Sequence, residues 1–280
     1  MLAAILCGSL SHDTVWAKSD VDLVLVTVDD RKVPGGSMAL LAEGVNVHTM
    51  LMPRAQFRKV AEGSLRNSFM HAFLAKGKIL FSRDPSIDEV FRGIGTLGGR
   101  DTRIQLFAAA TWALPSLYKA HKWLLTRGDL EYAALWLLYA ATPLARVEVL
   151  SANHLAGREV LQQAMALNPK FFGTIYTGLL NGKKTRAGVQ AALDAADRYL
   201  ADRARNLFSP LLDYLEEAGD ARSATDIEHA FEKQFNLEGV VTAAEYLADI
   251  GLVGKAGVAA RLTKKSTGSV EELAFFHLPG

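Results

Sequence analysis

Cysteine, excess charge of one sign and long apolar runs are all scarce in this sequence. Its 280 residues include one cysteine, Cys7, which excludes an internal disulfide framework and is typical of a reducing compartment. The 31 Lys and Arg nearly balance the 30 Asp and Glu, so no net basic charge favours nucleic acid or an anionic membrane as partner. No apolar run approaches the roughly 18 residues of a membrane span. We therefore expect a cytoplasmic protein without a membrane segment.

Core-forming residues are abundant and fall into three successive patterns. Half of the residues are hydrophobic and 22% are charged, a composition typical of soluble globular proteins. A chain of 280 residues is long enough for two or three small domains. We predict domains at 1–97, 101–219 and 221–280, with the glycine-rich stretch 92–101 as the linker between the first two.

The first pattern predicts an α+β domain with a mixed sheet. Short apolar runs bounded by glycine, proline or polar residues are typical of strands. Strands are predicted at 2–7, 21–28, 45–52 and 78–84, and helices at 54–63 and 68–77. The runs at 2–7 and 21–28 are almost continuously apolar, so we expect these strands to be buried on both faces of the sheet.

In the second pattern, apolar residues recur every three or four positions over long stretches, which predicts an all-α helical bundle. Its helices are predicted at 103–125, 130–150, 158–167 and 185–219. Pro115, Pro143 and Pro210 fall inside these stretches, and we expect each proline to kink or interrupt its helix.

The third pattern is a helix, a second helix and a β-hairpin, an order that resembles a winged-helix module. The helices are predicted at 223–235 and 237–253, and the strands at 258–263 and 271–278. Residues 221–280 contain six Lys or Arg against eight Asp or Glu, and the second helix has no basic residue. A DNA-binding surface needs several cationic contacts to phosphates. We therefore expect this module to pack or to bind protein, and we do not expect a nucleic-acid partner.

Two aspartates mark the start of the strand predicted at 21–28. Side chains at i and i+2 of a strand share a face, so Asp20 and Asp22 point the same way. Adjacent carboxylates repel each other unless a cation lies between them or one of them is protonated, and their hard oxygens suit Mg²⁺ or Mn²⁺. The pair is therefore a candidate divalent-cation site; the alternative is two surface turn residues.

A Gly-Ser pair, Gly8 and Ser9, directly follows the first predicted strand. Glycine at such a point lets a phosphate approach the backbone closely, and the free N–H groups of a following helix start bind anionic oxygens. The hydroxyl of Ser9 adds a further donor. The pair therefore predicts a phosphate-binding turn, with an ordinary loop glycine as the alternative.

The stretch from Gly8 to Leu23 resembles the signature of the nucleotidyltransferase superfamily related to DNA polymerase β. In that signature an apolar strand ends in Gly-Ser, a Gly-Thr or similar pair follows, and Ser-Asp-x-Asp-Leu leads into the next apolar strand. The matching residues are Gly8-Ser9, Asp13-Thr14 and Ser19-Asp20-Val21-Asp22-Leu23. The order of the later segments is similar to that of small members of the family, the minimal and the antibiotic-modifying nucleotidyltransferases, which carry a helical domain behind the catalytic one.

The resemblance implies transfer of a nucleoside monophosphate from ATP or another NTP to a hydroxyl of an unidentified acceptor, a small molecule or a protein. Asp20 and Asp22 would hold Mg²⁺ or Mn²⁺, and the metal would offset phosphate charge and orient the leaving group. The residues implied to hold the nucleotide are Gly8, Ser9, Thr14 and Ser19.

Three features depart from the family pattern. Asn46 stands where a third carboxylate is expected; it offers a neutral oxygen and cannot act as a base. Asp13 replaces a common glycine. The pattern also places a helix before the first strand, whereas this sequence opens on the strand, so either the start is truncated or another element covers that edge.

Because Asn46 cannot act as a base, a general base for the implied reaction would have to be another residue. His48 shares a strand face with Asn46 and is a candidate proton acceptor, or else a core or rim histidine. Glu131 and Glu148 of the helical region are further candidates. His12 and His48 could join the aspartates in a transition-metal site, but the seven histidines lack the spacing of such sites, which argues against it.

Aromatic and basic residues gather in the first two long helices. The rings are Trp112, Trp123, Trp136, Tyr118, Tyr132 and Tyr139, and the cations are Lys119, Lys122 and Arg127. The ring spacing predicts mostly core packing, with one or two rings as candidates to line a pocket for a base or an acceptor ring. The cations form either a solvated face or a surface that meets triphosphate.

Two functions from different classes follow from these observations. The first is a metal-dependent nucleotidyltransferase. The second, motivated by Asn46, is a catalytically inactive protein of the same fold that binds nucleotide or acts as a regulatory protein-interaction module. A DNA-binding regulator is disfavoured by charge. The acceptor, the preferred NTP and the oligomeric state stay open, and a homo-oligomer is compatible with the sequence.

Overall fold

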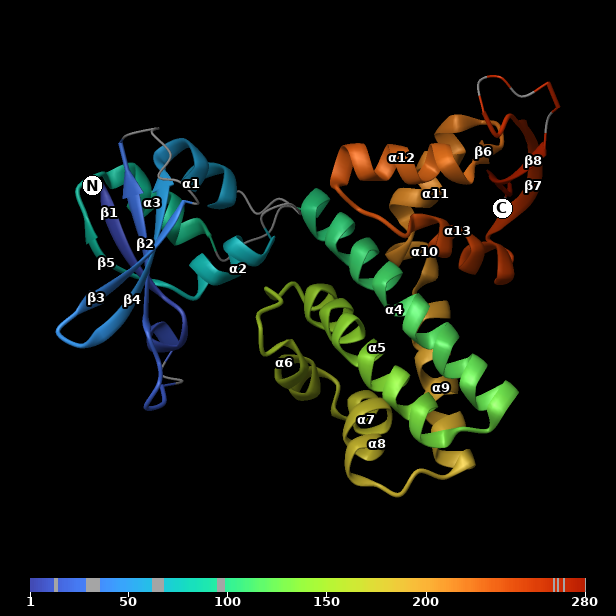
Figure 1. Ribbon diagram of the computed structural model, residues 1–280, viewed down its shortest axis with the longest axis horizontal. Helices are drawn as coiled ribbons and strands as arrows, with labels where there is room; N and C mark the ends of the chain where they lie inside the picture. Colours follow the sequence, from blue (N-terminus) through green and yellow to red (C-terminus); the bar gives the residue numbers. More distant parts are fainter. Residues whose placement is uncertain are drawn as a thin grey trace. The chain divides into compact units, whose positions relative to one another are not determined.

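The computed structural model describes residues 1–12, 15–28, 36–61, 68–94, 99–263, 265, 267–268 and 270–279. The chain divides into two compact units, Met1–Asp101 and Thr102–Gly280 (Figure 1). Of the predicted linker, residues 95–98 lie outside the described residues, while Gly93 ends one helix and Gly99 begins the next.

A five-stranded mixed sheet with the strand order β3-β4-β2-β1-β5 forms the first unit. β2 and β4 are parallel, and the other neighbouring strands are antiparallel. The strands are β1 (Ala3–Cys7), β2 (Val21–Thr27), β3 (Ser37–Ala42), β4 (Val45–Pro53) and β5 (Lys78–Ser82). The helices are α1 (Arg54–Ala61), α2 (Ser68–Ala75) and α3 (Pro85–Gly93). The predicted α+β class with a mixed sheet is confirmed, and β5 covers the edge of β1.

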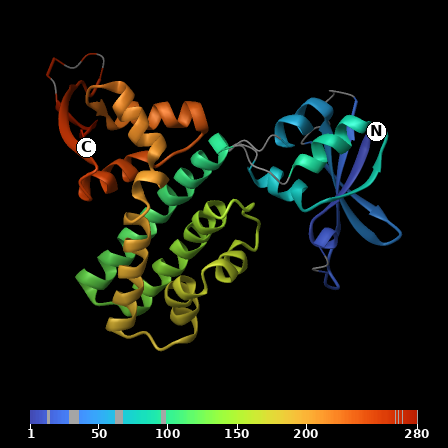
Figure 2. The same cartoon turned by 180° about the vertical axis from the view of Figure 1, so that it is seen from behind.

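Helices α1, α2 and α3 pack on one face of this sheet (Figures 1 and 2). Ile5, Val24 and Met52 are buried beneath them, together with Phe57 of α1 and Leu74 of α2. Burial alternates along β1, so the residues on its other face are only half-buried. The expectation that β1 and β2 are buried on both faces is therefore wrong, because the core-forming helices lie on one face.

Strand β3 and helix α3 were not predicted from the sequence, although the sequence contains a local signal for each of them. β3 pairs with β4 around Glu43 and Gly44, whose φ angles of 51° and 80° are those of a two-residue hairpin turn. The side chain of Asp84 accepts a hydrogen bond of 3.0 Å from the backbone N–H of Ser86 and so caps α3, with Pro85 in the first turn.

Helices dominate the second unit, which ends in a small sheet of order β6-β8-β7. The long or medium helices are α4 (Gly99–Arg127), α5 (Leu130–Ser151), α6 (Val160–Leu167), α9 (Arg186–Ala201), α11 (Ser209–Ala218), α12 (Ala224–Phe235) and α13 (Val240–Asp249). The short segments are α7 (Pro169–Phe172), a π-helical turn (Gly173–Thr177), α8 (Gly178–Asn181) and α10 (Ala204–Leu207). The strands are β6 (Arg222–Ser223), β7 (Val253–Ala260) and β8 (Val270–His277).

α4 lies alongside α9 and α11 in the opposite direction (Figures 1 and 2). Near the start of α4, the guanidinium of Arg103 donates to the hydroxyl of Ser209 at 3.0 Å and to the carboxylate of Asp213 at 2.6 Å. Farther along α4, Nε2 of His121 lies 2.8 Å from the carboxylate of Asp197 in α9. The predicted helical character of this region is confirmed.

Alanine and aliphatic residues, rather than aromatic rings, make the buried face of α5. This helix packs on α6 and α9, and its buried alanines are Ala133, Ala134, Ala140, Ala141 and Ala145. Trp112, Tyr132 and Tyr139 are instead exposed, at 50%, 38% and 55%. The prediction that these rings fill the core is wrong, since close approach of helices at alanine leaves no space for a ring.

The three prolines act differently. α4 continues through Pro115 and α5 through Pro143, so neither proline ends its helix. The helix predicted at 185–219 is divided into α9, α10 and α11, with Pro210 in the first turn of α11. Proline is favoured in that position because the first N–H groups of a helix have no intrahelical acceptor.

The C-terminal helices share aromatic contacts with α4. The ring centroid of Phe107 lies 5.3 Å from that of Phe231 in α12 and 6.1 Å from that of Phe208. The hydroxyl of Ser223 accepts from the backbone N–H of Asp226 at 3.1 Å and caps α12. Two helices and an antiparallel hairpin follow in the predicted order, and β6 adds a short third strand.

Among the described residues, α5 alone is long and apolar enough to cross a membrane by length and composition, with a mean hydropathy of 1.3. Of the apolar window, 56% is buried inside the protein, which is how the core helix of a soluble protein is used. The fold is therefore consistent with a soluble protein.

The contact between His121 and Asp197 makes stability depend on pH. The hydrogen bond and the charge of Asp197 raise the pKa of His121 above its ordinary 6.5. Protonated His121 therefore stabilises the fold fully below about pH 6.5, and this contribution is lost as the pH rises through the raised pKa. We expect Asp197→Asn to lower the free energy of unfolding by up to about 1 kcal/mol at low pH and by less at alkaline pH.

Urea unfolding across this pH range measures the effect. Asp213→Asn is the matched control, because it breaks the ion pair between Arg103 of α4 and Asp213 of α11. Arg103 stays charged over the whole pH range, so the effect of this substitution should not depend on the titration of a histidine. A loss of stability in Asp197→Asn that does not change with pH contradicts the prediction.

Candidate functional site

The loop after β1 and the start of β2 lie at one end of the sheet, on two neighbouring inner strands. Gly8 turns the chain with a φ of +66°, and a 3-10 turn follows at Ser9–His12. The backbone N–H and the hydroxyl of Ser11 both donate to the carbonyl of Gly8, at 3.1 and 2.8 Å. These bonds fix the turn that follows the first strand.

Asp22 lies between two neighbouring strands. It is opposite Cys7 in the antiparallel pair of β1 with β2, and opposite His48 in the parallel pair of β2 with β4. It shares a strand face with the buried Val24, because alternate side chains of a strand point the same way. The face that carries the hydrophobic core thus continues into the half-buried Asp22 and Asp20.

His48 completes a group of three possible metal ligands. Its Nδ1 atom lies 2.8 Å from Oδ2 of Asp20. One ligand atom from each of Asp20, Asp22 and His48 lies within 4.8 Å of the other two. Asp20 and Asp22 are half-buried and His48 is exposed, so the group is open to solvent. Two carboxylates and an imidazole within this span suit a divalent cation.

The Gly-Ser turn and the acidic pair belong to one site. A Cβ atom at Gly8 would overlap the carboxylate of Asp22, so that carboxylate lies directly against the glycine backbone. The positive φ of Gly8 independently disfavours any side chain. Glycine is therefore required here both by the conformation of the turn and by the closeness of Asp22.

Two serines bring the ends of the loop together. The hydroxyl of Ser9 donates to that of Ser19 at 3.3 Å, and the hydroxyl of Ser19 accepts from the backbone N–H of Trp16 at 3.0 Å. The backbone N–H of Ser19 also donates to the carbonyl of Trp16 at 2.9 Å. Two of the three hydroxyls predicted to bind phosphate, those of Ser9 and Ser19, thus lie together, in the loop that separates Gly8 from Asp20.

The single cysteine does not offer a reactive thiol beside the acids. Cys7 is fully buried, and burial, together with the negative charge of Asp22, raises the pKa of its thiol to about 12. The thiol is therefore protonated at physiological pH, whereas a cysteine nucleophile or metal ligand acts as the thiolate. Cys7 serves as a small apolar residue beneath the site.

The remaining predicted site residues are placed as follows. Asn46 is exposed on β4, on the same face as His48, and extending the register of β2 with β4 by one residue puts it beside Asp20. Asp13 and Thr14 lie outside the described residues, as does the side chain of His12.

Comparison with solved structures gives the fold. A nucleotidyltransferase-like protein from Exiguobacterium sibiricum matches with a TM-score of 0.67 and 16% identity, over 99% of this chain and 94% of that one. The protein has a nucleotidyltransferase-like fold. No protein-family model matches the sequence, and no curated protein does. At this identity the likeness concerns the fold alone, and the candidate site at Gly8, Asp20, Asp22 and His48 is defined by this chain's own residues.

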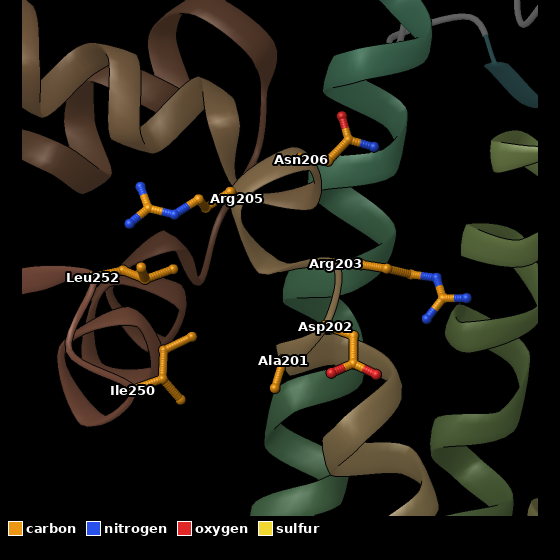
Figure 3. Close-up of a pocket in the computed structure, with 7 residues that line it drawn as sticks. All are labelled: Ala201, Asp202, Arg203, Arg205, Asn206, Ile250 and Leu252. Carbon is orange, nitrogen blue, oxygen red and sulfur yellow. The ribbon is translucent and has the colours of Figure 1, made fainter. Parts of the chain in front are cut away.

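The helical unit has a cavity of about 520 Å³, but its lining residues do not converge on one point as Asp20, Asp22 and His48 do. It is lined by the end of α9, by α10 and by the turn after α13, including Ile250 and Leu252. Figure 3 shows Arg203 and Arg205 extending in opposite directions from this segment. The guanidinium of Arg203 also lies 4.1 Å from the centre of the Tyr199 ring. Because the cations do not converge, we assign no ligand to this cavity.

Glu148, a candidate base from the sequence, is engaged in packing. Its carboxylate accepts from the hydroxyl of Tyr199 at 2.7 Å and from the amide of Asn168 at 3.3 Å. Burial, followed by this hydrogen bond, raises the pKa of Tyr199, so the tyrosine stays a neutral donor. These bonds give Glu148 a structural role between α5, α9 and the start of α7.

Aromatic residues join α4 and α5 at the surface. The rings of Trp123 in α4 and Tyr132 in α5 meet edge to face at 4.7 Å, and within α5 the rings of Trp136 and Tyr139 meet at 5.3 Å. The ammonium of Lys119 lies 4.2 Å from the centre of the Trp136 ring. Lys119, predicted as part of a basic edge, is therefore partly used in a cation–π contact within the protein.

The contact between His48 and Asp20 was not predicted from the sequence. Strand alternation correctly predicted that His48 and Asn46 share a face, but the neighbour of that face was unknown. The missing observation was the parallel pairing of β2 with β4, which sets Asp22 opposite His48. No local pattern encodes this pairing, because β3 and its hairpin turn lie between the two strands in the sequence.

Proposed function

We propose that the protein is a metal-dependent nucleotidyltransferase that uses ATP or another NTP. The observation that carries the proposal is the grouping of Asp20, Asp22 and His48 beside the Gly8–Ser9 turn, within a nucleotidyltransferase-like fold. Carboxylates at alternate positions of one strand face would hold a divalent cation, and the N–H and O–H groups of the neighbouring turn would donate to phosphate oxygens.

The proposed reaction joins a hydroxyl oxygen of the acceptor to the α-phosphorus of the NTP and breaks the bond to the bridging oxygen of the β-phosphate. Pyrophosphate leaves, and the hydroxyl proton is released. A divalent cation bound to Asp20 and Asp22 would neutralise charge on the phosphates. The backbone of Gly8 and the hydroxyls of Ser9 and Ser19 would position the phosphates, and we keep Thr14 as a further candidate. Asn46 would add a neutral oxygen, and His48 an imidazole nitrogen.

An assay with NTPs labelled at the α-phosphate tests this proposal. The full chain is incubated with each NTP, a divalent cation and a panel of hydroxyl-bearing acceptors, and both pyrophosphate and transferred label are measured. We expect cation-dependent release that Asp20→Asn lowers by at least about a hundredfold. Cation-independent release, or equal release by Asp20→Asn, contradicts the assignment of the site.

The second candidate function is a nucleotide-binding or regulatory module of the same fold without turnover. Asn46 favours it, because the site then has one carboxylate fewer than the family pattern expects. Under this alternative the protein binds a non-hydrolysable NTP analogue but releases no pyrophosphate with any acceptor. The same assay, combined with a binding measurement, separates the two functions.

We also propose that residues 221–280 act as a winged-helix-like module that packs or binds protein. The order of α12, α13 and the β7–β8 hairpin supports this interpretation. The apolar face of α13 is buried, with Val240, Ala243, Ala244 and Leu247 in contact with the rest of the unit. The acidic residues of α13 do not suit a DNA groove.

A further inference from the structure

We propose that this site selects a first-row transition-metal ion, such as Mn²⁺, Co²⁺ or Zn²⁺, over Mg²⁺, with His48 as the third protein ligand. This inference rests on the proposed function, since it concerns the same metal site. The sequence alone argued against such a site, because the histidine spacing gave no support. The pairing of the strands supplies the missing proximity.

The geometry lets all three side chains reach one ion. Ligand atoms bound to a divalent transition metal lie about 2.0–2.2 Å from it, so two ligands of one ion are at most about 4.4 Å apart. His48 Nδ1 and Asp20 Oδ2 are already 2.8 Å apart, and the whole group lies within 4.8 Å. Small side-chain rotations therefore suffice, and the half-exposed imidazole, at 53%, has the space for them.

The backbone holds the histidine in this position. The Cα atom of His48 is opposite that of Asp22 on one side and opposite that of Ala39 in β3 on the other. Both strands that flank His48 are hydrogen-bonded to β4, so the imidazole is attached to the interior of the sheet rather than to a loop.

The donor set decides the selectivity. Mg²⁺ prefers a shell of oxygen atoms and keeps several waters, whereas imidazole nitrogen suits Zn²⁺ and other later first-row metals, with Mn²⁺ at the weak end of that series. Asn46 stands where the family pattern expects a third carboxylate, so this chain offers two carboxylates and an imidazole instead of three carboxylates. Replacing an oxygen ligand by a nitrogen ligand raises the affinity of the site for first-row transition metals, in the Irving–Williams order. It does not raise the affinity of the site for Mg²⁺.

The experiment compares Mn²⁺ with Mg²⁺ on the full chain, in wild type and in His48→Gln. His229→Gln is the control, because it removes an exposed histidine from α12 in the other unit. Affinities are measured by calorimetry in the presence of a non-hydrolysable ATP analogue. Pulsed electron paramagnetic resonance of bound Mn²⁺ reports directly whether a ¹⁴N atom of imidazole is a ligand.

We expect wild type and His229→Gln to bind Mn²⁺ at least about tenfold tighter than Mg²⁺ and to show ¹⁴N coupling. His48→Gln is expected to lose the coupling and most of the Mn²⁺ preference while its Mg²⁺ affinity stays nearly unchanged. This inference is wrong if His48→Gln keeps the preference for Mn²⁺ over Mg²⁺ and wild type shows no ¹⁴N coupling. The cation site at Asp20 and Asp22 would still stand in that case, and His48 would act as a proton acceptor or as an ion-pair partner of Asp20. Absence of any cation-dependent binding overturns the proposed function as well.

Discussion

Replacing Asp22 by asparagine is expected to abolish the stabilisation that a divalent cation and an NTP analogue give to the wild-type protein, without unfolding the metal-free protein. Ligand at a hundredfold excess over its dissociation constant stabilises a protein by about 2.7 kcal/mol, and this gain should disappear. The reason is that Asp22 supplies one of the two negative charges of the ligand group, and asparagine supplies none. The metal-free variant should melt at or above the wild-type temperature, because a carboxylate beside Asp20 is removed.

Thermal unfolding with and without Mn²⁺ and the analogue measures this difference. Glu89→Gln is the control, since it removes one exposed negative charge from α3 of the same unit. We expect this control to keep the full rise in melting temperature. An equal rise in Asp22→Asn and in wild type would show that Asp22 is not a ligand.

Gly8→Ala is expected to damage both the fold and the site. The substitution forces alanine into a φ of +66° and pushes its methyl group into the carboxylate of Asp22. Backbone strain of this kind costs about 1–3 kcal/mol, and displacement of Asp22 should lower the affinity for a divalent cation by at least about tenfold. Urea unfolding and metal titration measure the two effects separately.

Gly36→Ala is a closely matched control for this prediction. The φ of Gly36 is +65°, nearly that of Gly8, but nothing lies within 4 Å of where its Cβ atom would be. This variant should therefore show the backbone strain alone and bind metal like wild type. If Gly8→Ala and Gly36→Ala bind metal equally well, the contact between Gly8 and Asp22 does not position the carboxylate.

Local sequence patterns predicted the parts of the fold that depend on neighbouring residues. β1, β2, β4 and β5 were found because apolar runs and strand alternation repeat over a few positions. The same alternation placed Asp20 and Asp22 on one face of β2. β3 was missed although its Glu43–Gly44 turn is a local signal, and so was the Asp-Pro start of α3. These two omissions were therefore avoidable.

Features that depend on strand pairing or on helix packing could not be read locally. The approach of His48 to Asp20 requires the parallel pairing of β2 with β4. Trp112 and Tyr139 are exposed because they lie on faces of α4 and α5 that do not pack against other helices of the unit. Likewise, Glu148 was a reasonable candidate base until its hydrogen bond with Tyr199 gave it a structural role.

Calorimetric titration of the full chain with a non-hydrolysable ATP analogue, with and without a divalent cation, tests the central claim most directly. The account predicts binding of the analogue to wild type that requires the cation and that is lost when Asp20 and Asp22 are both replaced by asparagine. Binding that is indifferent to the cation and to these substitutions, or no binding in any condition, would contradict a metal and nucleotide site at the start of β2.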